Sequence, residues 1–268
     1  MIKARLILDP PRDGFWNMAA DEALFDCLEG SGFPVTLRIY GWSRPTLSLG
    51  RRQKLSEPDV AECRGLGVDV VKRIGGGGAV FHGSEITYCF VSRIGPPGMP
   101  DVTDPRLWRE IFVYFLESLG IAADDQDRQQ DSRLCAASCF STANGDEPTI
   151  NGRKWIGSAR RKSRKCFLQH GSILIEQQPD FLCKLMPGSG PNISTGLRKF
   201  VPSLSEHSAT DALVIAVKKN LQLEFSAGDY TDAEHSSIKR LRALKTGELR
   251  PSPAARESES LPSRLHGS

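Results

Sequence analysis

The chain has 268 residues, of which 39% are hydrophobic and 25% charged, as in an ordinary soluble globular protein. Its formal net charge of +3 is too small to indicate a nucleic-acid-binding protein by itself. The longest apolar runs have the length of strands, so we expect no membrane span and no secretory signal. Seven cysteines without regular spacing do not indicate a disulfide framework, and we expect a cytoplasmic protein with reduced thiols.

The first part of the chain predicts strands and helices joined by short loops. Hydrophobic periodicity gives, in chain order, a strand at 4–8, a helix at 15–28, strands at 35–40 and 46–49, a short helix at 56–64, and strands at 68–73, 79–81 and 86–91. Ser56 is the predicted N-cap of the short helix, with Pro58 in its first turn.

The second part predicts a helix at 105–119, two short segments at 149–150 and 154–156, a strand at 167–175, and helices at 211–223 and 231–244. Asn151-Gly152 is a favoured two-residue hairpin turn, and Thr231 with Glu234 forms a capping box. Few large apolar residues follow, so we expect one folded domain over residues 1–245 and a disordered tail over 246–268. Strands joined by tight turns predict an α+β fold with a mixed, largely antiparallel sheet flanked by helices.

A run of four glycines interrupts the strand pattern in RIGGGGAVFHG, residues 73–83. Without Cβ atoms, this loop can adopt positive φ and lets a ligand lie against its amides. It lacks the Gly-Lys-Ser/Thr of a P-loop and the following helix of a dinucleotide site. A flexible hairpin loop is the alternative, but Arg73 before it and His82 after it favour ligand binding.

A second chemistry-bearing segment begins at Cys139, a candidate nucleophile with a lysine, Lys154, fifteen residues later. Further residues that could contact a substrate are Gly157, Ser158, Ala159, His170 and Gly171. The cation-rich segment after Cys139 would favour its reactive thiolate, although free cysteines are commonly small buried hydrophobes. Cys135 and Cys139 lack a second ligand pair at suitable spacing, so we expect no metal site.

Residues 153–165 hold seven lysines and arginines and no acid. Such a run is either a solvated face or a docking surface for an acidic partner. Because Trp155 is the single aromatic residue in this run and no recognised reading helix is present, we expect an acidic protein and no nucleic acid.

Several motifs in this order resemble the superfamily of lipoate–protein ligases, octanoyltransferases and biotin–protein ligases. They are NMAADEAL (17–24), LRIYGWSRPTLSLGRRQ (37–53), RIGGGGAVFH (73–82), and NGRKWIGSA (151–159) followed by LQHGSILI (168–175). The resemblance covers residues 1–195 and extends weakly to the last helix. It implies that residues 1–245 form a catalytic domain like those of lipoate and biotin ligases, with the acyl chain in a tunnel beneath the glycine loop.

Within the superfamily, Cys139-Phe140 before the lysine motif resembles the cysteine-dependent octanoyltransferases, as do GSEITY (83–88) and QHGSI (169–173). Three positions depart from that pattern. Gly78 stands where these transferases usually have arginine, Gly83 where an acidic residue is usual, and Arg160 where glutamine is typical. The glycine at position 78 is instead similar to the ligases.

The resemblance implies a monomeric enzyme that moves an octanoyl group from acyl carrier protein to a lysine of lipoyl domains or a glycine cleavage H-like protein. Cys139 would hold the acyl group as a thioester, while Lys154 would help to deprotonate the thiol and stabilise charge on the thioester oxygen. No cofactor is needed in this reaction. The implied substrate-binding residues are Arg73, Gly76, Gly77, Gly78, His82, Gly157, Ser158, Ala159, His170 and Gly171.

Three alternatives stay open at the level of the sequence. An ATP-dependent lipoate ligase would use ATP and Mg²⁺, with Lys154 holding an acyl-adenylate and Cys139 incidental. An amidotransferase would move the acyl group between lipoyl proteins through the same cysteine. A non-catalytic binding module would keep the fold without turnover.

Overall fold

The computed structural model describes residues 1–124, 140, 147–179, 181–188 and 191–248. Within these residues, six strands form one sheet in the order β7-β8-β6-β2-β1-β9 and three form a second in the order β4-β3-β5. The large sheet contains β1 (Ile2–Leu8), β2 (Val35–Tyr40), β6 (Glu85–Arg93), β7 (Ile156–Lys162), β8 (Cys166–Leu174) and β9 (Leu223–Ala227). The small sheet contains β3 (Thr46–Leu49), β4 (Asp69–Lys72) and β5 (Val80–His82).

Both sheets mix parallel and antiparallel pairs. Strands β7, β8, β6 and β2 are antiparallel neighbours, whereas β1 is parallel to both β2 and β9. In the small sheet β3 is parallel to β4 and antiparallel to β5. The predicted α+β fold with a mixed, largely antiparallel sheet is therefore confirmed.

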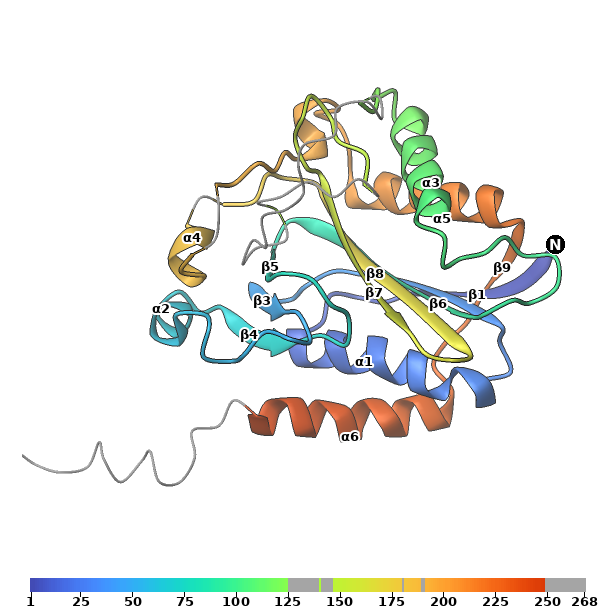
Figure 1. Ribbon diagram of the computed structural model, residues 1–268, viewed down its shortest axis with the longest axis horizontal. Helices are drawn as coiled ribbons and strands as arrows, with labels where there is room; N and C mark the ends of the chain where they lie inside the picture. The colour runs from blue at the N-terminus through green and yellow to red at the C-terminus, as the bar shows by residue number, and fades with distance from the viewer. Residues whose placement is uncertain (125–139, 141–146, 180, 189–190, 249–268) are drawn as a thin grey trace, which may run out of the picture.

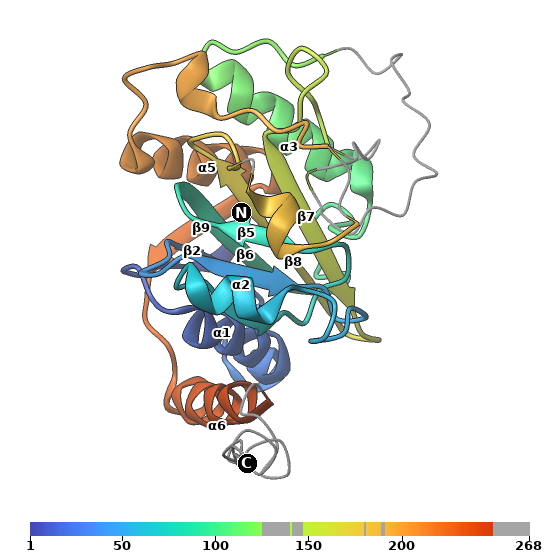
Figure 2. The ribbon, with the colours of Figure 1, turned by 90° about the vertical axis from the view of Figure 1, so that its left-hand side faces the viewer.

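Helices cover both faces of the large sheet. Helices α3 (Pro105–Ser118) and α5 (Glu206–Leu221) pack on one face, and α1 (Gly14–Cys27) and α6 (Asp232–Glu248) lie on the other (Figure 1, Figure 2). Trp108, Phe112 and Phe115 of α3 are fully buried against the sheet. The short helices α2 (Val60–Gly65) and α4 (Leu182–Leu185) lie beside the small sheet (Figure 1). The small sheet thus remains at one side of the molecule, where it meets the large one.

The two helix starts with the clearest sequence signals are confirmed. Asp104 caps α3 by accepting the N–H of Arg106 at 2.9 Å, with Pro105 in the first turn. At α6, the Thr231 hydroxyl accepts the N–H of Glu234, whose carboxylate accepts the N–H of Thr231. These side chains satisfy backbone donors that a helix start would otherwise leave unpaired.

Other boundaries differ from the predictions. Asp59, not Ser56, caps α2, because its carboxylate accepts the N–H of Glu62. Helix α5 begins at Glu206 rather than residue 211, since Ser205 supplies its cap. Helix α6 continues to Glu248, so the predicted domain boundary at residue 245 falls inside it.

A tertiary contact accounts for the longer last helix. Lys245 Nζ lies 2.6 Å from Glu22 Oε2 of α1, which holds the final turns of α6 against the domain. Residues 249–268 of the predicted tail lie outside the described residues. Strand β9, helix α4 and the part of β7 after Ile156 were not predicted. Strand β9 pairs with the distant β1, and Leu185 of α4 accepts the N–H of the distant Asp59.

No helix in the described part of the chain is both long and apolar enough to cross a membrane. Among the cysteines of the same part, Cys27, Cys63, Cys89 and Cys166 are free thiols.

Candidate functional site

A pocket that is partly open to solvent lies between the two sheets. Its walls include Ser48, Val80 and His82 from the small sheet, and Thr87 and Ser172 from the large one. The predicted substrate-binding residues that line it are Arg73, His82, Gly157, Ser158, Ala159, His170 and Gly171. Segments far apart in the sequence thus meet around one concave surface, as expected for a small-molecule site.

Arg73 stabilises the glycine loop through hydrogen bonds to its backbone. Its buried guanidinium donates hydrogen bonds to the carbonyls of Gly76 and Gly78, each at 2.6 Å, and to the Ser48 carbonyl at 2.9 Å. Gly77 has φ +82°, and a Cβ added at Gly50 would come within 2.0 Å of the Gly77 carbonyl oxygen. This conformation therefore requires glycine at Gly77 and at the neighbouring Gly50, and Arg73 at the start of the loop lines the pocket.

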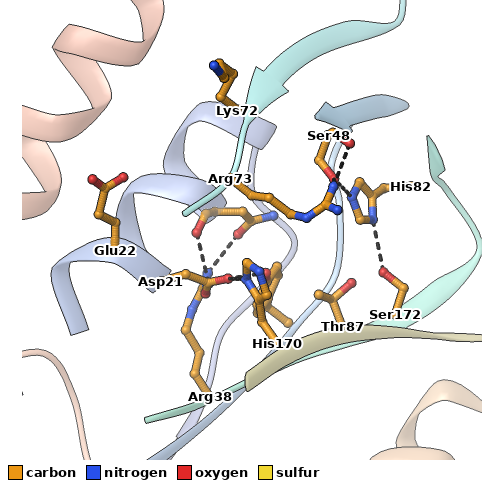
Figure 3. Close-up of polar contacts among 12 residues, drawn as sticks. Asp21, Glu22, Arg38, Ser48, Lys72, Arg73, His82, Thr87, His170 and Ser172 are labelled. Atoms are coloured by element: carbon orange, nitrogen blue, oxygen red, sulfur yellow. Dashed lines mark hydrogen bonds and ion pairs between the residues drawn. The ribbon is translucent and has the colours of Figure 1, made fainter. Parts of the chain in front are cut away.

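His82 is fixed by contacts on both ring nitrogens. Nδ1 lies 2.7 Å from Glu85 Oε1. Nε2 lies 2.7 Å from Ser48 Oγ (Figure 3). The imidazole stacks on Trp42 with 3.8 Å between ring centroids. The hydroxyl of Thr87 also donates to Glu85 Oε1, at 2.7 Å. These contacts hold the polar groups in place and form a wall of fixed shape, although Glu85 Oε2 is buried without a partner among the described residues.

His170 is held by a buried carboxylate. Its Nδ1 lies 2.9 Å from Asp21 Oδ2, which also accepts the Tyr40 hydroxyl, while Asp21 Oδ1 lies 2.7 Å from the Arg38 guanidinium (Figure 3). Burial alone would raise the pKa of Asp21, but the His170 hydrogen bond and the Arg38 charge outweigh it and lower that pKa. His170 Nε2 is buried without a partner among the described residues, and it faces Gly75, where a Cβ would come within 2.3 Å.

Lys154 forms a buried ion pair that the sequence did not reveal. Its Nζ lies 2.7 Å from Glu147 Oε2, and the two side chains are 1% and 4% exposed. Glu147 Oε1 accepts hydrogen bonds from the N–H and the hydroxyl of Ser158, each at 2.6 Å. Because Ser158 lines the pocket, Glu147 connects the predicted catalytic lysine to the pocket wall.

The predicted nucleophile, Cys139, lies outside the described residues. The next residue, Phe140, is buried against Val80 and Leu174, and its ring centroid is 5.8 Å from Lys154 Nζ. Cys135, which we considered beside it for a metal site, is also outside them. No group of three or more His, Cys, Asp or Glu side chains in the described ranges could hold a metal ion.

Sequence reasoning missed the acidic residues Asp21, Glu85 and Glu147, which orient His170, His82 and Lys154. Two of these acids lie close in sequence to the group that they orient, since Glu85 is three residues from His82 and Glu147 is seven residues from Lys154. A hairpin turn at Asn151-Gly152 brings the residues before it alongside those after it, which places Glu147 near Lys154. Asp21 meets His170 across 149 residues of sequence, and no local pattern predicts that contact.

Comparison with known proteins identifies the family of this chain. The family model described as "Lipoyl protein ligase A/B catalytic domain" matches residues 13–226. A relative named Octanoyltransferase LipM from Kyrpidia tusciae is 32% identical over 251 residues, covering 85% of this chain and 90% of the relative. Another of that name, from Carboxydothermus hydrogenoformans, is 34% identical over 244 residues, covering 88% of each chain.

A solved structure of a lipoate protein ligase from T. acidophilum with bound lipoic acid is similar in fold. The TM-score is 0.75 at 22% identity, and the match covers 91% of this chain and 96% of that one.

Proposed function

Because the chain belongs to the lipoyl protein ligase A/B catalytic-domain family, we propose that it is an octanoyltransferase that acts in protein lipoylation. Acyl carrier protein is the donor, and a lysine of a lipoyl domain or of a glycine cleavage H-like protein is the acceptor. Relatives named as octanoyltransferases, similar over most of both chains, support the reaction class.

The reaction runs in two steps through Cys139. In the first, the Cys139 sulfur attacks the carbonyl carbon of the carrier thioester, and the carrier's sulfur leaves and takes up a proton. In the second, the neutral amine of the target lysine attacks the new thioester, loses a proton and forms an amide, while the Cys139 thiol is restored. Both steps start from a thioester, so neither needs a nucleotide, and two smaller barriers replace one large one.

The position of Phe140 beside Lys154 is the observation that carries this mechanism. Consecutive Cα atoms are about 3.8 Å apart, so the residue bonded to Phe140 can bring its thiol close to Lys154. The Lys154 ammonium would stabilise the thiolate of Cys139 and then the negative charge on the thioester oxygen. Val80 lines the pocket and contacts Phe140, which connects this reaction centre to the acyl site.

The pocket suits an acyl chain because most of its polar side chains are already paired. Ser48, His82 and Thr87 form hydrogen bonds within the protein, so an apolar chain can lie against them without removing water from unpaired groups. Met18 and Val80 supply apolar surface in the same pocket. In this proposal, the glycines of the loop, Gly157, Ala159 and Gly171 let the chain approach the backbone closely.

The basic run provides a docking surface for acidic partners. It continues from the pocket wall at Gly157–Ala159 along β7 to the exposed residues Lys162, Arg164 and Lys165. Acyl carrier proteins and lipoyl domains are both acidic as classes. Opposite charges on such surfaces accelerate association, and salt weakens the effect.

The proposal is tested by mixing the protein with octanoyl-carrier protein and an apo lipoyl domain without ATP. We expect an octanoyl-sized mass gain on the lipoyl domain, removed by the Lys→Arg change at its target lysine. If modification requires ATP and a free acid, the protein is a ligase. If only an octanoylated H-like protein serves as donor, it is an amidotransferase.

A further inference from the structure

We propose that Glu147 positions Lys154 for acyl transfer and joins it to the acyl-pocket wall at Ser158. This inference rests on the proposed octanoyl transfer. Glu147 does not touch the substrate in this account, and it acts through the two groups that it binds.

Glu147 and Lys154 form a buried ion pair. Glu147 Oε2 and Lys154 Nζ are 2.7 Å apart, and both side chains are almost completely buried. A buried ammonium without an opposite charge would be strongly unfavourable, so the carboxylate helps to hold the Lys154 side chain in its position. The backbone of Lys154 is fixed as well, since its N–H donates to the Ile193 carbonyl and its carbonyl accepts the Thr195 N–H.

The other carboxylate oxygen of Glu147 binds Ser158 of the pocket wall. Glu147 Oε1 accepts both the backbone N–H and the hydroxyl of Ser158, each at 2.6 Å. On β7, Ser158 pairs with Gly171 of β8, and both residues line the pocket. A single carboxylate therefore fixes the lysine relative to the surface that would bind the acyl chain.

Hydrogen bonds also hold the chain segment that carries Glu147. The next residue, Pro148, accepts the Trp155 indole N–H through its carbonyl at 2.7 Å. Asp124 accepts hydrogen bonds from the Thr149 hydroxyl and from the N–H groups of Asn151 and Gly152, at 2.7 to 2.9 Å. The hairpin that carries Glu147 and Lys154 is thus held at its turn and at its base. Such support keeps a reactive group within the narrow geometry that catalysis needs.

This arrangement favours one of the two roles considered for Lys154. A carboxylate 2.7 Å away stabilises the ammonium form. Lys154 then keeps its proton and stabilises negative charge on sulfur or oxygen. The proton that leaves the Cys139 thiol ends on the carrier's thiol, so the first step needs no net proton transfer to Lys154.

A double-mutant cycle tests the inference. We would compare the parent, Glu147→Gln, Lys154→Gln and the double variant in single-turnover formation of the octanoyl adduct on the protein, followed by intact mass. Glu147→Gln should slow the rate at saturating carrier by about 10²-fold, while the half-saturating carrier concentration stays unchanged. Glu147→Asp should restore part of the rate, because it returns the charge.

The decisive comparison is between Lys154→Gln and the double variant. If Glu147 acts through Lys154, removing it in the Lys154→Gln background should cause no further loss. The double variant holds no unpaired buried charge, so it tests the idea even if Glu147→Gln folds poorly. Glu176→Gln, which breaks a half-exposed pair with Arg198, is the matched control and should keep the parent rate.

Two results would overturn the role of Glu147. One is a Glu147→Gln rate within about threefold of the parent rate. The other is a double variant that is slower than Lys154→Gln by the same factor by which Glu147→Gln is slower than the parent. A parent protein that forms no adduct would instead contradict the proposed octanoyl transfer, and this inference would fail with it.

Discussion

His170 Nδ1 lies 2.9 Å from Asp21 Oδ2, and this contact joins β8 to α1 beneath the pocket. The Asp21 carboxylate also binds the Arg38 guanidinium and the Tyr40 hydroxyl. One buried acid thus fixes a pocket histidine and neutralises a buried cation. A hydrogen on Nδ1 is the arrangement that this carboxylate favours, and the other ring nitrogen, Nε2, faces Gly75.

Asp21→Asn should destabilise the fold strongly, because it removes the opposite charge from Arg38, which is fully buried. Asp9 also pairs with Arg38, so we expect a loss near the lower end of about 3–5 kcal/mol in the free energy of unfolding. Denaturant titration measures it. Glu22→Gln, which breaks the partly exposed pair with Lys245, is the neighbouring control and should cost about 0–1 kcal/mol. Equal losses in the two variants would contradict this role of Asp21.

The same residue predicts a pH dependence of stability. The folded-state pKa of Asp21 is lowered from its ordinary value of 3.8, so its ionised form stabilises the fold above that pH. The contribution is lost as the pH falls through the lower folded-state pKa. Unfolding free energies measured from neutral pH to below about pH 4 should therefore fall more steeply for the parent than for Asp21→Asn. Parallel curves would show that Asp21 does not contribute to acid sensitivity.

The sequence predicted features that depend on local patterns. The glycine run, the Asn151-Gly152 turn and the capped starts of α3 and α6 all follow from short-range chemistry. The acids that orient the site residues did not follow, because His170 and Asp21 come together only when α1 packs on the large sheet. The end of α6 was missed because the distant contact of Lys245 with Glu22 decides it. The starts of α2 and α5 were missed although their caps, Asp59 and Ser205, are local.

Gly50→Ala should disrupt the glycine loop. An added Cβ would lie 2.0 Å from the Gly77 carbonyl oxygen, a backbone atom that cannot move without shifting the loop. We expect a loss of at least about 1–3 kcal/mol in the free energy of unfolding. Gly76→Ala is the matched control, because its Cβ would meet no atom within 4 Å, and it should change stability by no more than about 0.5 kcal/mol. Thermal unfolding of both variants measures these changes in stability. A Gly50→Ala variant as stable as the parent would contradict the close packing of Gly50 against Gly77.

Charge reversal at Arg161 and Lys162 should slow docking of the carrier. Both residues lie at the end of β7, and Lys162 is exposed. We expect a lower kcat/KM and a flatter dependence on salt, because the opposing charges no longer accelerate association. Reversal of Lys3 and Lys218, exposed on β1 and α5, changes the net charge equally and serves as control. If kcat/KM depends on salt in the same way in both variants, the basic run is a solvated face and not a docking surface.

The proposed mechanism requires Cys139 to carry the acyl group. Its most direct test is the intact mass of the parent and of Cys139→Ala after mixing with octanoyl-carrier protein without ATP. We expect an octanoyl-sized gain in mass in the parent, which hydroxylamine removes, and no gain in mass in the variant. A gain in both proteins, or a parent that stays unmodified while it acylates a lipoyl domain, would contradict it.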